Sequence, residues 1–393
     1  MNHNLILLGL CQGLFLTNNV TFIAINGLVG LALAPVGWMA TLPVTGYVVG
    51  GALSAPLVAR VQAHVGRKRS FQFGLVVAAL AAAMCAYAIS IQAFWLLVAS
   101  TVVAGFYSAN ASLYRFAGPE LVAPSYKEKA ISLVLAGGII GAFIGPNLAS
   151  TTRSMLVAPF AGAYVALIAV AIVAFTALSF INFPPHKTPV PGATSGRPLR
   201  EIARQPTFVI AVFAGALGYG VMNLLMAATP IAMQQCKHPF ESAALVLEWH
   251  VLGMFVPSFF TGHLIKRFGA LPVMGVGALL NFACVIVALS GVDLMQFLVA
   301  LAVLGVGWNF LYTGATTLFT ETYRPEEKNK AQGAMDTCVF ATMALTSFAS
   351  GALVTTQGWT LLNYGSLVPM VLISAALLWL TLHRRALALP RAA

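Results

Sequence analysis

The sequence predicts an all-α integral membrane protein in which twelve membrane-spanning helices form two pseudo-symmetric bundles of six. Three observations lead to this fold class. The chain is 59% hydrophobic and only 8% charged, it contains twelve apolar runs of spanning length, and its second half repeats landmarks of its first half.

The composition excludes several other classes of protein. A chain of 393 residues this apolar carries more hydrophobic surface than one water-soluble core could bury. Its net charge of +11 could suggest a nucleic-acid partner, but the basic residues fall in short segments between apolar runs, so we expect none. The five cysteines are scattered singly, which indicates neither a disulfide framework nor a zinc finger.

The apolar runs define the expected helices, and each is long enough to cross a hydrocarbon core about 30 Å thick. No basic region or cleavage site precedes the first run, so we expect a spanning helix there and not a signal peptide. The expected spans are 5–31, 38–59, 71–90, 93–114, 130–150, 160–182, 207–232, 242–263, 271–290, 294–318, 331–354 and 360–382.

The distribution of basic residues predicts the orientation in the membrane. With both termini in the cytoplasm, 19 of the 21 Lys and Arg residues lie on the cytoplasmic side, and only Arg153 and Lys237 lie outside. Cytoplasmic loops carry this excess by the positive-inside rule. We therefore expect a multi-pass protein of the cell inner membrane with cytoplasmic N- and C-termini.

A polar stretch rich in proline and basic residues divides the chain after six spans. It predicts an N-terminal bundle at 1–182, a cytoplasmic linker at 183–206 and a C-terminal bundle at 207–393. The halves resemble each other, since Gly66 and Gly269 each follow a basic loop at an offset of 203 residues. Two such halves are typical of transporters that rock around a site at the membrane midplane.

Soft metal donors gather at one predicted depth in the seventh and eighth spans. Met222 and Met226 share one helix face, as do His250 and Met254, because residues four apart lie above one another. At 1.5 Å per residue the four side chains lie ~9 to ~18 Å below the outer helix ends. Thioethers select Cu(I) and imidazole also binds copper, so we predict a copper site there, with packing methionines as the alternative.

Polar and aromatic side chains within other spans predict a cavity, because they lack partners in hydrocarbon. Each could instead form a hydrogen bond between helices. The cavity or substrate candidates are Asn18, Asn19, Asn110, Tyr114, Asn223, Trp308, Asn309 and Tyr312.

Over nearly its full length the chain resembles the major facilitator superfamily. That family carries G-x-L-A-D-R-x-G-R-R between its second and third helices, and residues 59–68 read ARVQAHVGRK here. The family's acid, which helps to latch the cytoplasmic gate, is replaced by Ala63 and, in the second copy, by Lys266. We therefore expect other gating contacts, for which Asp336 with Arg60 or Arg67 is the hypothesis; a structural ion pair is the alternative.

A narrower resemblance concerns the soft donors. Met-x-x-x-Met followed by His-x-x-x-Met is similar to the pattern of the CcoA-like bacterial copper importers, a branch that also includes riboflavin importers. The resemblance implies copper import for cytochrome oxidase assembly, with Met222, Met226, His250 and Met254 handling the metal as substrate.

Two other functions remain open on the sequence. A transporter of a small organic molecule such as riboflavin would need aromatic faces and several hydrogen-bond partners. A non-transporting receptor or scaffold on the same fold is a remote alternative. No nucleophile–base set or nucleotide-binding loop is present, so we predict that the protein is not an enzyme and has no prosthetic group. A monomer in the lipid bilayer and a coupling proton are further expectations.

Overall fold

The computed structural model describes residues 3–123, 127–184, 196–324 and 327–388. The helices of the first half are α1 (His3–Leu33), η1 (Gly37–Met39), α2 (Leu42–Ser90), α3 (Phe94–Ala111), α4 (Tyr114–Ala117), η2 (Gly118–Leu121), α5 (Lys127–Ala136), α6 (Gly138–Thr152) and α7 (Ala161–Ser179). Those that follow are α8 (Leu199–Ile202), α9 (Pro206–Gln235), α10 (Phe240–Phe255), α11 (Ser258–Phe268), α12 (Ala270–Leu289), α13 (Leu294–Thr320), α14 (Lys328–Thr356) and α15 (Gly358–Ala388).

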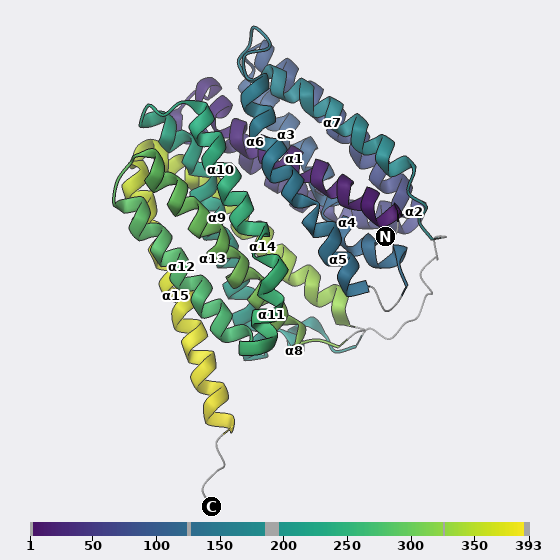
Figure 1. Ribbon diagram of the computed structural model, residues 1–393, viewed down its shortest axis with the longest axis vertical. Coiled ribbons are helices and arrows are strands. Elements are labelled where there is room, and N and C mark those ends of the chain that lie inside the picture. The colour runs from purple at the N-terminus through teal and green to yellow at the C-terminus, as the bar shows by residue number, and fades with distance from the viewer. Residues whose placement is uncertain (1–2, 124–126, 185–195, 325–326, 389–393) are drawn as a thin grey trace, which may run out of the picture.

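Twelve spans in the described part of the chain are long and apolar enough to cross a membrane, which confirms the predicted number. The protein is therefore an all-helical, multi-pass membrane protein. Figure 1 shows the earlier helices, in purple to blue, grouped beside the later helices, in green to yellow. We call the end that carries both chain termini the terminal side and the opposite end the distal side.

Two glycines mark the repeat that relates the halves. The helix α2 contains two spans joined at Gly66, whose φ of 78° and ψ of 171° interrupt the helical backbone. Gly269 occupies the matching position between α11 and α12, with φ 88° and ψ 162°. A positive φ costs little only for a residue without a Cβ atom, so the predicted offset of 203 residues corresponds to one shared backbone turn.

Within the N-terminal half, neighbouring helices approach closely at small residues. A Cβ atom on Gly50 would collide with the carbonyl of Val102, and one on Gly105 would collide with the backbone of Gly50 and Gly51. Small residues allow such close packing in lipid, where dispersion contacts replace the hydrophobic effect. These contacts hold α2 against α3.

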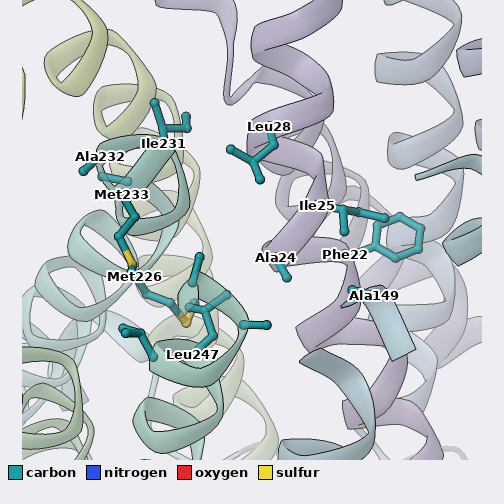
Figure 2. Close-up of a cluster of buried hydrophobic side chains, with 14 of the residues drawn as sticks. Phe22, Ala24, Ile25, Leu28, Ala149, Met226, Ile231, Ala232, Met233 and Leu247 are labelled. Atoms are coloured by element: carbon teal, nitrogen blue, oxygen red, sulfur yellow. The ribbon is translucent and has the colours of Figure 1, made fainter. Parts of the chain in front are cut away.

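The halves meet on the distal side. Thr41 Oγ1, before α2, donates to the carbonyl oxygen of Ser347 at 2.6 Å and accepts the backbone N–H of Gly351 at 3.1 Å. In Figure 2, Ile231 of α9 lies opposite Leu28 of α1, and both belong to one buried cluster that spans the halves. The structure is thus closed on the distal side.

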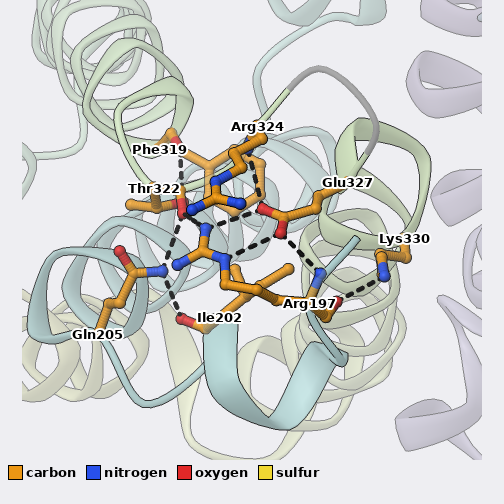
Figure 3. A network of polar contacts seen from close by, with 8 residues as sticks. All are labelled: Arg197, Ile202, Gln205, Phe319, Thr322, Arg324, Glu327 and Lys330. Carbon is orange, nitrogen blue, oxygen red and sulfur yellow. Dashed lines mark hydrogen bonds and ion pairs between the residues drawn. The ribbon is translucent and has the colours of Figure 1, made fainter. Parts of the chain in front are cut away.

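A polar network fixes the last part of the predicted linker, residues 197–205, to the C-terminal half (Figure 3). The guanidinium of Arg197 donates to both carboxylate oxygens of Glu327 at 2.8 Å, and Glu327 is fully buried. Gln205 and Arg197 also donate to the carbonyl oxygen of Thr322. Arg197 holds the pKa of the Glu327 carboxyl well below its usual range. Part of the linker, 185–195, lies outside the described residues.

Candidate functional site

Four aromatic side chains gather in the C-terminal half where it faces the N-terminal half. Trp308 and Tyr312 are one turn apart on α13, and their rings stack at 5.2 Å with an interplanar angle of 11°. Tyr219 of α9 meets both rings edge-on at 5.3 Å. Phe255, the last residue of α10, lies 6.5 Å from Trp308. We call these four residues the aromatic cluster.

The aromatic cluster has unused polar capacity and lies next to the opposite half. Trp308 Nε1 is buried and has no hydrogen-bond partner among the described residues. Phe255 packs beside Gly138 of α6 and beside a small cluster that contains Ala142. Aromatic faces with few polar groups form a surface on which a planar organic ring can stack.

Arg115 of α4 brings a positive charge to the same region. Its guanidinium lies within electrostatic range of the Tyr219 and Tyr312 hydroxyls and of the Asp336 carboxylate. Its Nε atom is buried without a partner among the described residues, although its guanidinium lies 4.7 Å from the Phe116 ring. The N-terminal half thus supplies a cationic donor to a region whose aromatic surface comes from the C-terminal half.

The predicted soft donors are all buried. Met222, Met226 and Met254 belong to one apolar cluster, and Figure 2 shows Met226 of α9 extending towards Leu247 of α10. His250 lies three residues after Leu247 and is fully buried. The structure therefore buries all four side chains in the C-terminal half, and their joint ligation of copper stays a prediction.

His250 is held in a defined tautomer. Its Nδ1 lies 2.7 Å from the carbonyl oxygen of Leu301 on α13. Because a carbonyl only accepts, Nδ1 carries the proton and Nε2 presents a lone pair. Nε2 is buried and has no hydrogen-bond partner among the described residues. Among the described residues, no group of three His, Cys, Asp or Glu side chains is placed to hold a metal ion. A copper site would therefore depend on the methionines.

Two asparagines among the cavity candidates, Asn110 and Asn223, bond to neighbouring helices. Asn110 donates to the carbonyl oxygen and hydroxyl of Ser70 on α2. Asn223 donates to three oxygens of α14, those of the Met343 carbonyl and the Thr346 and Ser347 hydroxyls. These bonds use the amide donors of both residues, so packing explains Asn223, while Asn110 Oδ1 is buried without a partner among the described residues.

Asn309 and Tyr114 have structural surroundings of the same kind. Asn309 donates to the Met254 carbonyl and the Ser258 hydroxyl at 2.7 Å and accepts from Thr261 Oγ1 at 2.6 Å. Tyr114 is fully buried and meets the Phe71 ring edge-on at 4.7 Å. Asn18 is buried and Asn19 is half-buried on α1. Trp308 and Tyr312 therefore remain the strongest of the predicted cavity residues.

The predicted gating residues are not joined to one another in this distally closed arrangement. Arg67 instead forms a two-pronged ion pair with Glu120, with contacts of 2.8 and 2.6 Å. Asp336 and Arg60 are both exposed on the terminal side. A gate pair of Asp336 with Arg60 or Arg67 therefore stays a hypothesis for another conformation.

Sequence reasoning missed three residues of this region. Tyr219 is one of ten tyrosines and carries no motif, and Phe255 resembles any other apolar residue at a helix end. Arg115 directly follows a predicted span and was counted only as a charge of the cytoplasmic side. A basic residue beside an apolar span and a tyrosine inside a span were the available signals.

Comparison with known proteins assigns the family. The model of the Major Facilitator Superfamily matches residues 5–249 and 212–393, which together span nearly the whole chain. The chain belongs to the major facilitator superfamily. It is a transporter and not an enzyme, as the sequence predicted.

Relatives and solved structures agree with this family. The riboflavin transporter RfnT of Brucella anthropi is 38% identical over 363 residues, which cover 92% of this chain and 91% of that protein. The uncharacterized MFS-type transporter YddS of Bacillus subtilis is 26% identical, with coverage of 87% and 82%. The nucleoside transporter NupG has the same fold, with a TM-score of 0.78 at 12% identity over 95% of this chain and 99% of that one. The human organic anion transporter MFSD10 has a TM-score of 0.69 at 14% identity, with coverage of 95% and 99%.

Proposed function

We propose that the chain imports a planar organic molecule of the riboflavin class through the space between its halves, using the aromatic cluster as the binding surface. The observation that carries this proposal is the stacked pair of Trp308 and Tyr312, whose indole Nε1 has no partner among the described residues. The 38% identity to a riboflavin transporter over 92% of the chain supports it. The charge split of 19 to 2 supports cytoplasmic termini and an inner-membrane location.

The chemistry of riboflavin fits this surface. Its three-ring isoalloxazine is flat and can stack on an aromatic face, which is worth ~1–3 kcal/mol for comparable bases on protein rings. Its two ring carbonyl oxygens accept hydrogen bonds. Trp308 Nε1 and Arg115 Nε are two buried donors that lack acceptors among the described residues. A bound flavin would satisfy donors that otherwise carry a desolvation cost.

An uptake assay tests this proposal. The chain is expressed in a bacterium that neither synthesises nor imports riboflavin, and growth and uptake of labelled riboflavin are measured. We expect wild-type protein to restore both, and Trp308→Leu to reduce uptake at low riboflavin by about 5- to 150-fold, the equivalent of 1–3 kcal/mol. Phe310→Leu is the matched control, because Phe310 lies on α13 beside Phe260 and outside the aromatic cluster. Wild-type protein that reaches the membrane without restoring uptake would rule the proposal out.

Copper import is the second candidate function, and the buried Nε2 lone pair of His250 is the observation that favours it. Met222, Met226 and Met254 would supply the thioethers of a Cu(I) site. Met226→Leu keeps most of the side-chain volume but removes the sulfur lone pair. If copper is the substrate, Met226→Leu and His250→Gln should both abolish copper accumulation while membrane levels stay unchanged. Uptake of copper that is insensitive to both substitutions would remove this candidate.

A further inference from the structure

A pocket of about 610 Å³ opens between the halves on the distal side, far along the helices from the aromatic cluster. Its N-terminal wall includes Leu28, Arg153 and Phe160, and its C-terminal wall includes Gln234 and Phe240. Pockets of ~300–1,000 Å³ are large enough for small organic ligands. Neither the transport proposal nor the copper prediction uses this space, which we call the distal pocket.

One cation dominates the chemistry of the distal pocket. The guanidinium of Arg153 lies 5.5 Å from the ring centroids of both Phe160 and Phe240, which meet edge-on at 5.1 Å. Its acidic neighbour is Glu241, at 3.7 Å, but both side chains are partly exposed to solvent, at 42% and 61%. An exposed ion pair at that distance contributes little to stability, so the Arg153 guanidinium can still pair with a second anion.

The backbone of the pocket wall is strained. Gln92 and Phe160 both line the pocket and have positive φ angles of 54° and 67°, which side chains other than glycine adopt rarely. Such residues persist where surrounding contacts hold them, and they are frequent at ligand sites. Phe160 thereby directs its ring towards Arg153 and Phe240.

We propose that the distal pocket binds a compact aromatic monoanion, whose acidic group pairs with Arg153 and whose ring packs against Phe160 and Phe240. The walls come from both halves, so they separate when the distal side opens. A ligand in contact with both walls therefore binds the closed state more tightly and shifts the equilibrium towards it. The ligand is an inhibitor of distal opening and acts at a site separate from the transported substrate.

Direct binding tests this proposal without a transport assay. The purified full-length protein in neutral phosphatidylcholine nanodiscs is titrated calorimetrically with 1-naphthalenesulfonate and with the neutral 1-naphthalenesulfonamide. We expect saturable binding of the sulfonate, weakened about tenfold by Arg153→Gln, because a charge-assisted bond of this kind is worth roughly one factor of ten. Arg153→Lys should retain most of the affinity. Arg267→Gln is the matched control, since Arg267 lies over the Phe268 ring outside the pocket.

Glu241→Gln separates a ligand role of Arg153 from a structural one. Both Arg153→Gln and Glu241→Gln break the same ion pair, but only the second leaves Arg153 free for the ligand. We expect Glu241→Gln to bind the sulfonate as tightly as wild type or more tightly. Equal weakening by both substitutions, equal binding of the neutral sulfonamide, or no saturable binding to wild-type protein would each overturn the proposal. None of these results bears on riboflavin uptake, so the two proposals fail separately.

Discussion

Thr41 provides the sharpest test of how the halves are held together. Its hydroxyl makes two short hydrogen bonds to α14, at 2.6 and 3.1 Å, with a longer contact of 3.5 Å to the Phe348 carbonyl oxygen, and it is fully buried. Gly351 permits this approach, because a Cβ atom there would collide with Thr41. Thr41→Val keeps the shape of the side chain and removes both bonds.

The size of the effect follows from these contacts. Each bond contributes roughly 0.5–1.5 kcal/mol. The Ser347 carbonyl and the Gly351 N–H are four residues apart in α14 and can keep their helical bond, so we take the lower part of the summed range, about 1–2 kcal/mol. Because the hydrogen bonds of Thr41 to α14 exist only when the halves meet distally, their loss should raise the ratio of distally open to distally closed protein about 5- to 30-fold.

Distance measurements between spin labels test this shift. Labels at the exposed distal positions Met155 and Gln357 report on the two halves, in a background with Cys236→Ser and Cys338→Ser, since the other three cysteines are buried. Thr41→Val should increase the population at long distance. Thr41→Ser should not, and neither should Thr45→Val, because Thr45 bonds only to the carbonyl of Thr41. An unchanged distance distribution in Thr41→Val would refute the assignment of this contact as the distal closure.

Three further predictions concern stability. Arg197 lowers the pKa of Glu327, so the network stabilises the protein above the ordinary carboxyl pKa of 4.5 and loses its effect as the pH falls below that value. Glu327→Gln should therefore lower the thermal unfolding temperature at pH 7 by more than Glu321→Gln, whose pair with Arg384 is exposed. The difference between the two variants should shrink in acid. Asn309→Leu removes the hydrogen bonds to the Met254 carbonyl on α10 and to the Ser258 and Thr261 hydroxyls on α11. It should lower the free energy of unfolding by ~1–3 kcal/mol, seen as a lower unfolding temperature with unchanged riboflavin affinity. Gly50→Ala should reduce the yield of monodisperse protein in size-exclusion chromatography, whereas Gly275→Ala, with no atom within 4 Å of the added Cβ, should not.

The fold was largely predictable because its determinants are local. Twelve apolar runs correspond to twelve spans, since hydrocarbon requires each span to satisfy its own backbone. Gly66 and Gly269, whose offset of 203 residues indicated the repeat, both adopt a positive φ. The sequence did not reveal that the fifth predicted span would divide at Gly137.

The site was less predictable because it depends on which helix faces meet. Asn110 and Asn309 looked equally suited to a substrate, but each finds partners 40 to 55 residues away in the chain. Trp308 and Tyr312 were recognised as cavity candidates, whereas Tyr219 joins them only through the packing of α9 against α13. His250 was identified from its position, while its Nδ1 bond to Leu301 required the tertiary structure.

Equilibrium binding of riboflavin to the purified protein, followed by quenching of flavin fluorescence, tests directly whether the aromatic cluster binds a flavin. We expect saturable quenching, weakened by Trp308→Leu and unaffected by Phe310→Leu. Absence of saturable riboflavin binding, together with Cu(I) binding that His250→Gln abolishes, would contradict this expectation and establish copper as the substrate.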